Sequence, residues 1–69
     1  MSAYYICEID RNEQKEAKDA TRAAILKAGL EPYRRFKAKQ NAEAYANNVK
    51  AATGARLIVS EAYFAMSPF

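Results

Sequence analysis

Residues 3–9 read Ala3-Tyr4-Tyr5-Ile6-Cys7-Glu8-Ile9, a stretch rich in aromatic and β-branched residues. Such residues favour extended backbone, and successive side chains of a strand point to opposite faces. Tyr5, Cys7 and Ile9 would therefore share one face, and the residues between them the other. The stretch predicts a β-strand over 3–9.

A helix is predicted next, over 13–28. Asp10 and Asn12 end the strand and offer capping side chains, and Glu13 and Glu16 bring negative charge to the first helical turn. Gly29 suits the position after the last turn. The apolar residues follow the i, i+3, i+4, i+7 spacing of a helix face: Ala17, Ala20, Thr21, Ala24, Ile25 and Ala28. Because most of them are alanine, this helix can lie close to a sheet.

The second half of the chain predicts a short strand over 33–37, a helix over 39–53 and a strand over 55–64. Pro32 before the short strand suits an edge position. The apolar face of the second helix comprises Ala42, Tyr45, Ala46, Val49 and Ala52, and Gly54 stops it. Residues 57–59 are apolar on both faces, which is typical of a strand at the centre of a sheet. An apolar tail follows over 65–69.

These elements predict one small α/β or α+β domain over residues 1–69, a two-layer sandwich of order β-α-β-α-β. A three-stranded sheet would carry two helices on one face, and the order becomes β-α-α-β if the short strand is a loop. Parallel strands joined by right-handed crossovers would place the helices this way. The other face and both edges of the sheet would stay open, which is usual for a contact surface.

The core is expected to be thin. Of 69 residues, 51% are hydrophobic, but fifteen of these are alanine. A core of this size rarely supplies more than about 3–5 kcal/mol without disulfides, metal or oligomerisation. Self-association or docking on a larger protein is therefore expected.

The composition argues against catalysis. The chain has no histidine and one cysteine, so metal sites of the usual types and a nucleophile beside a histidine base are not expected. Cys7 lies in an apolar stretch, which predicts a buried core residue. Gly29 and Gly54 each follow a predicted helix, where a phosphate-binding loop would have to precede one. We predict no enzyme activity and no cofactor.

A basic and aromatic segment covers residues 33–39, and Arg56 adds one more cation. Its candidate residues are Tyr33, Arg34, Arg35, Phe36, Lys37 and Lys39. Cations neutralise phosphates and aromatic rings stack on bases, so this mixture suits single-stranded nucleic acid. Two other interpretations stay open: a charged edge strand that resists aggregation, and a contact with an acidic protein.

Residues 33–46 resemble the strand-then-helix half of the small module found at the N-terminus of some RNase H enzymes and in viroplasmin, which binds duplex nucleic acid. The likeness covers fourteen residues, and the rest of the module is missing from the chain.

Two features indicate protein contacts. Leu26 lies on the far side of the first helix from its apolar stripe, so it should be exposed unless the helix end bends over it. The C-terminal segment contains four large apolar side chains: Tyr63, Phe64, Met66 and Phe69. They would either fold over the open sheet face or insert into a partner or a second copy of the chain.

The sequence therefore predicts a non-enzymatic protein-binding regulator or adaptor that modulates a larger protein, such as a phage or mobile-element accessory protein. A homodimer is plausible, and nucleic-acid binding through residues 33–39 is the alternative function. The net charge of +3 and the isoelectric point near 9.2 permit both. No apolar run approaches the length of a membrane span, so a cytoplasmic protein is expected.

Overall fold

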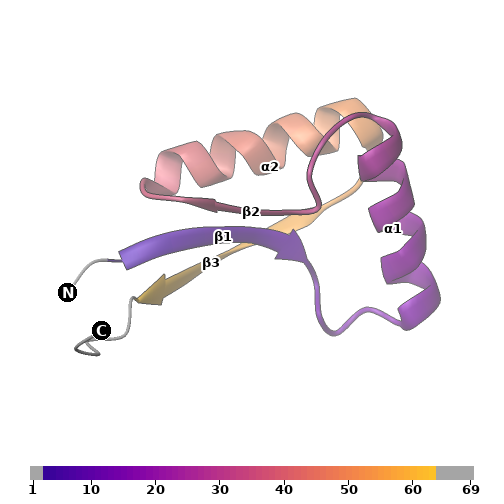
Figure 1. The fold of residues 1–69 in the computed structure, drawn as a ribbon, viewed down its shortest axis with the longest axis horizontal. Helices are drawn as coiled ribbons and strands as arrows, with labels where there is room; N and C mark the ends of the chain where they lie inside the picture. Colours follow the sequence, from indigo (N-terminus) through magenta and orange to yellow (C-terminus); the bar gives the residue numbers. More distant parts are fainter. Residues whose placement is uncertain (1–2, 64–69) are drawn as a thin grey trace.

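The computed structural model describes residues 3–63, which form three strands and two helices. In chain order these are β1 (Ala3–Ile9), α1 (Lys15–Lys27), β2 (Tyr33–Phe36), α2 (Lys39–Thr53) and β3 (Leu57–Tyr63) (Figure 1). The predicted order β-α-β-α-β and the small α+β fold are confirmed. The bounds 3–9 and 39–53 agree with the structure. The predicted tail over 65–69 lies outside the described residues.

The strands run antiparallel in the order β2-β1-β3. The parallel arrangement is therefore wrong, and so is the central position expected for the last strand, because β1 lies between the other two. The path of α1 explains the direction of β2. This helix stands across the end of the sheet rather than along its face, so the chain enters β2 at the same end at which it leaves β1 (Figure 1).

Helix α2 covers one face of the sheet and buries Ala42 and Val49 against it. Its predicted apolar face is correct except at Ala52, which is exposed. Thr53 takes that place, and its hydroxyl donates a hydrogen bond of 2.8 Å to the Val49 carbonyl. The helix ends at Gly54, whose φ of 77° favours glycine.

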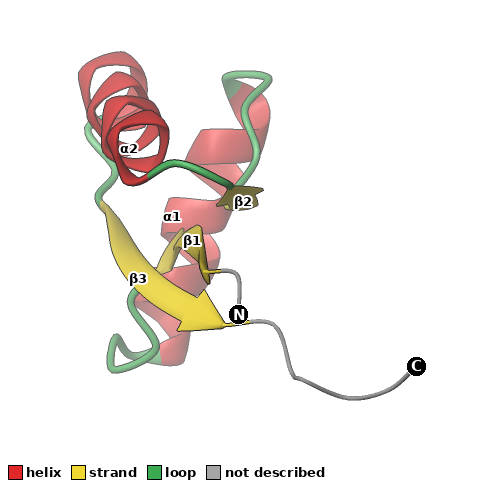
Figure 2. Ribbon diagram, turned by 90° about the vertical axis from the view of Figure 1, so that its left-hand side faces the viewer, coloured by secondary structure: helices red, strands yellow, loops and turns green. Residues whose placement is uncertain are grey.

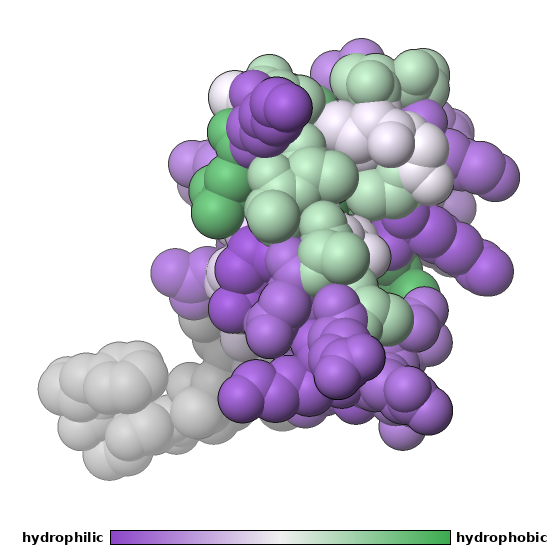
Figure 3. All heavy atoms as spheres, turned by 90° about the vertical axis from the view of Figure 1, so that its right-hand side faces the viewer, coloured by the Kyte–Doolittle hydropathy of each residue, from purple (hydrophilic) through white to green (hydrophobic). Residues whose placement is uncertain are grey.

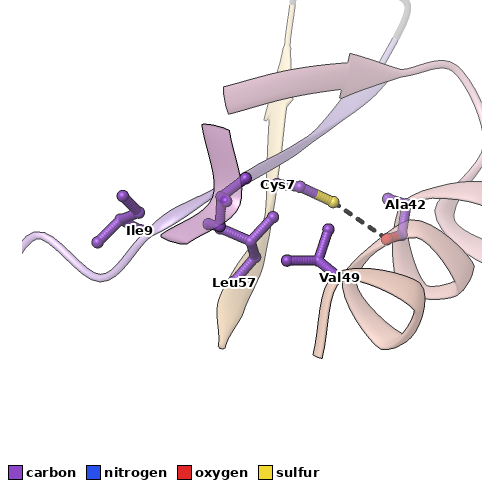
Figure 4. Close-up of a cluster of buried hydrophobic side chains, with 6 residues drawn as sticks. Cys7, Ile9, Ala42, Val49 and Leu57 are labelled. Carbon is purple, nitrogen blue, oxygen red and sulfur yellow. Dashed lines mark hydrogen bonds between the residues drawn. The ribbon is translucent and has the colours of Figure 1, made fainter. Parts of the chain in front are cut away.

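The core is one small cluster between α2, the end of α1 and the sheet (Figure 4). Its buried members are Cys7, Ile9, Ile25, Ala42, Val49 and Leu57. Cys7 is completely buried, as the sequence predicted, and its thiol donates a hydrogen bond of 3.0 Å to the Ala42 carbonyl. Among residues 3–63, three fully buried side chains are larger than alanine, so the core of this described part is as thin as the composition indicated.

Helix α1 contacts the rest of the molecule through far fewer residues than its pattern predicted. Ile25 is its one buried residue, whereas the alanines at 17, 20, 24 and 28 are all exposed. Figure 3 shows this side of the molecule, where a narrow band of weakly hydrophobic residues runs between hydrophilic ones. The predicted alanine stripe is therefore wrong as a buried face. Alanine is common on both the buried and the exposed faces of helices, so a stripe of alanines does not identify the buried face.

The C-terminal end of α1 is fixed by its backbone. Leu30 N donates to the Ile25 carbonyl and Gly29 N donates to the Leu26 carbonyl, at 3.1 and 3.0 Å, which is the hydrogen-bond pattern of a Schellman motif. Gly29 has a φ of 78°, and Leu30 turns back to pack against the core. This turn aligns the chain with the start of β2. Neither helix of the described part is long and apolar enough to cross a membrane.

Candidate functional site

One face of the sheet lies opposite α2 and is covered by neither of the described helices (Figure 2). We call it the open face. The strand register places eight side chains there: Tyr4, Ile6 and Glu8 of β1, Tyr33 and Arg35 of β2, and Ile58, Ser60 and Ala62 of β3. The open face predicted from the sequence is therefore present, and it combines apolar side chains with a carboxylate and a guanidinium.

A shallow groove of about 400 Å³ runs over β1 and β3 on the open face. Its apolar lining comes from Ile6, Ile58 and Ala62. The turn over residues 10–12 forms one end, and the backbone there is fixed because Asn12 N donates to Asp10 Oδ1 at 2.9 Å. The groove therefore has an apolar floor and a polar rim.

Glu8 lies between this groove and a second concavity, and its side chain is only 10% exposed. Arg11 Nε donates a hydrogen bond of 2.8 Å to Glu8 Oε1. The same hydrogen bond raises the pKa of the Arg11 guanidinium. Glu8 is thus held in place by the turn that follows its own strand.

The second concavity lies between α1, the end of β1 and the start of β2. We call it the α1–β2 hollow. Its volume is about 250 Å³, and it is lined by Glu8, Ile9, Lys18, Arg22, Pro32 and Tyr33. Lys18 and Arg22 were not among the residues predicted from the sequence. Their i, i+4 spacing was visible as one flank of a helix, but only the antiparallel pairing of β1 and β2 brings that flank beside Tyr33.

The structure divides the predicted basic segment between two faces of the sheet. Arg34 and Phe36 point to the α2 side, where Arg34 Cζ lies 5.0 Å from the centre of the Phe36 ring and 5.1 Å from that of Tyr45. The two rings are 5.4 Å apart. Arg34 also forms an ion pair of 3.7 Å with Glu31. These two candidates therefore stabilise the contact of β2 with α2.

The turn before β2 is fastened to the same aromatic group. The Tyr45 hydroxyl donates to the Glu31 carbonyl at 2.9 Å and accepts from Glu31 N at 2.8 Å. Both hydrogen bonds hold the chain in position just before the strand begins.

The other members of the basic segment are exposed but separated. Tyr33 and Arg35 lie on the open face, and Arg35 Cζ is 5.8 Å from the centre of the Tyr4 ring. Lys37 and Lys39 follow the end of β2, whereas Arg56 precedes β3 at the opposite end of the sheet. The seven candidates therefore form no single surface.

The candidates for protein contact are only partly described. Leu26 is 56% exposed, as the sequence led us to expect, and Tyr63 is 57% exposed. The Tyr63 hydroxyl donates to the Glu61 carboxylate, which raises the pKa of Tyr63, and a hydrogen bond to the same carboxylate raises that of Tyr5. Phe64, Met66 and Phe69 lie outside the described residues.

The titratable groups of the described part offer no assembled catalytic set. Burial raises the pKa of the Cys7 thiol, which disfavours the reactive thiolate. Between residues 3 and 63, no three histidine, cysteine, aspartate or glutamate side chains are close enough to hold a metal ion. The open face and the α1–β2 hollow present apolar, aromatic and charged side chains.

No protein-family model, no curated protein and no solved structure matches this chain. The resemblance of residues 33–46 to the RNase H and viroplasmin module therefore stays a local one.

Proposed function

We propose that this chain is a non-enzymatic protein-binding module, a small regulator or adaptor that docks its open face on a larger protein. The observation that carries the proposal is the groove over β1 and β3, with its apolar floor and its charged rim. Apolar surface surrounded by polar groups is typical of protein contact sites. The thin core supports the same function, since a partner that covers the groove adds buried apolar area.

The partner class follows from the chemistry of the groove. A side chain or helix that inserts apolar groups between Ile6 and Ile58 would be accompanied by polar contacts to Asp10 and Arg11. A second copy of the chain is the other occupant that this function allows. The single buried thiol, with no cysteine to pair with, suits a reducing compartment such as the cytoplasm.

Two matched substitutions test the proposal. Ala62→Arg places a long cation in the groove, whereas Ala20→Arg makes the same chemical change on the exposed side of α1. Immobilised chain is incubated with nuclease-treated extract of the native host, and the retained proteins are identified by mass spectrometry. The wild type and Ala20→Arg should retain the same protein, and Ala62→Arg should lose it.

Equal retention by all three chains would contradict docking through the open face. Light scattering on the purified wild type separates the two occupants, because a second copy doubles the mass without any extract.

Binding of nucleic acid is the second candidate function. It is favoured by Tyr33 and Arg35, which are exposed on the open face, and by the α1 cations Lys18 and Arg22, which line the α1–β2 hollow together with Tyr33. Such binding would weaken steeply with salt, and affinity that ignores salt would count against it.

A further inference from the structure

The α1–β2 hollow carries positive charge that no carboxylate of the described residues neutralises by an ion pair. Lys18 and Arg22 are one helical turn apart and line the same side of the hollow. The ion pairs formed between residues 3 and 63 are Arg11 with Glu8 and Arg34 with Glu31, so neither cation takes part in one. Glu8, the carboxylate of the lining, is already engaged by Arg11. The hollow is therefore suited to an anion.

Lys18 differs from most lysines of the chain because it is half-buried. An anion bound in the hollow would lie beside the Lys18 side chain. The same anion would be within reach of the Arg22 guanidinium, which binds phosphate oxygens through paired N–H donors.

An aromatic ring completes the site. Tyr33 lines the hollow and is 53% exposed, so part of its ring is accessible to a planar ligand. Arg35 follows two residues later on the same face of the sheet. Cations around an exposed aromatic ring form the combination that holds single-stranded nucleic acid, in which the cations contact phosphates and the ring stacks on a base.

We infer that the α1–β2 hollow binds one nucleotide unit of a single-stranded nucleic acid. Lys18 and Arg22 hold its phosphate, Tyr33 stacks on its base, and Arg35 contacts the neighbouring phosphate. A hollow of about 250 Å³ accommodates a phosphate and part of the sugar, which leaves the base outside, on the Tyr33 ring. A duplex keeps its bases paired and stacked, so it cannot use the ring. This inference rests on the second candidate function above.

The test compares two double variants of equal charge. Lys18→Ala with Arg22→Ala removes the two cations of the hollow. Lys27→Ala with Lys50→Ala removes two exposed cations outside the hollow, one on α1 and one on α2. Alanine is the best helix former, so all four changes leave the helices intact. Circular dichroism verifies the fold. Affinity is measured by fluorescence anisotropy with a labelled oligodeoxythymidine of about ten nucleotides.

Loss of the hollow cations should weaken binding at least about tenfold and lower the slope of log affinity against log salt by about 0.7, the value expected for one lost phosphate contact. The control pair should change affinity far less. Tyr33→Ala should weaken binding about tenfold, since stacking is lost, whereas Tyr33→Phe keeps the ring and the affinity.

Several results would overturn the inference. Equal losses in the two double variants would show that only net charge matters, and undiminished binding by Tyr33→Ala would exclude stacking. Duplex DNA bound as tightly as the single strand would also reject it. If Arg35→Ala abolishes binding while the hollow variants do not, the hollow is rejected and nucleic-acid binding stands. If the wild type binds no strand at low salt, both fail, and protein binding is left as the function.

Discussion

Replacing Ile25 with alanine should cost this protein most of its stability, although Ile25 belongs to a helix whose surface is otherwise exposed. Its side chain is fully buried and is the one buried residue of α1. Truncation of a buried isoleucine to alanine typically costs about 2–5 kcal/mol, because apolar contact is lost and a cavity remains. We expect about 3 kcal/mol, against the roughly 3–5 kcal/mol that a core of this size supplies.

Leu26→Ala is the matched control, since the adjacent leucine is 56% exposed and should cost under about 0.5 kcal/mol. Urea unfolding followed by circular dichroism measures both variants. With a slope of about 1 kcal/mol per molar urea for a small domain, the Ile25→Ala midpoint should fall by about 3 M, and the variant should be partly unfolded in buffer. Midpoints that agree for the two variants would refute the assignment of Ile25 as the anchor of α1.

Three further predictions concern proton binding and a helix end. In the folded state the pKa of Cys7 is raised above 9.0 and those of Tyr5 and Tyr63 above 10.0, so the folded chain binds more protons than the unfolded chain at alkaline pH. The free energy of unfolding, measured with urea, should therefore be constant below pH 9 and fall above it. A rise above pH 9 would contradict this prediction. Glu61→Gln should lower the pKa values of Tyr5 and Tyr63, because the carboxylate that raises them is removed. An ultraviolet absorbance titration measures both values. Unchanged values would disprove the hydrogen bonds of these tyrosines to Glu61. Gly54→Ala should lower the free energy of unfolding by about 1 kcal/mol, measured with heat or urea. The cause is the φ of 77° alone, because nothing lies within 4 Å of the added methyl group. An unchanged free energy would show that the helix end adapts.

The elements with strong periodicity were predictable from the sequence. The alternation over residues 3–9 and the spacing of Ala42, Tyr45, Ala46 and Val49 gave β1 and α2 their correct bounds. Both patterns include a buried aliphatic side chain, Ile9 in β1 and Val49 in α2, and burial of such side chains contributes free energy to folding. Gly29 and Gly54 marked the helix ends because both adopt positive φ.

The arrangement of the strands was not predictable in the same way. Residues 57–59 are apolar on both faces, which favoured a central strand, yet Ile58 lies on the open face of an edge strand. The local composition of a strand does not determine which other strand it pairs with. The direction of β2 depends on α1 standing across the sheet end, and the weak alanine pattern of that helix carried no information about its position.

The candidate site was partly visible in the sequence. An open sheet face was predictable, because the sequence predicts two helices on one face of a three-stranded sheet. The groove on that open face depends on the antiparallel register of β1 and β3, which the sequence did not predict. The basic segment looked continuous, whereas strand alternation separates Arg34 from Arg35. The cations of the α1–β2 hollow come from a helix distant in sequence from Tyr33, so no local motif could have joined them.

We propose that the open face binds the partner of this protein, and methyl NMR of the complex is the decisive test of this proposal. Spectra of the chain are recorded with and without the captured partner protein. The methyl signals of Ile6, Ile58 and Ala62 should shift on binding, whereas those of Ala20 and Ala24 on the exposed side of α1 should not. Shifts confined to the α1 methyls, with the three groove residues unchanged, would contradict the account.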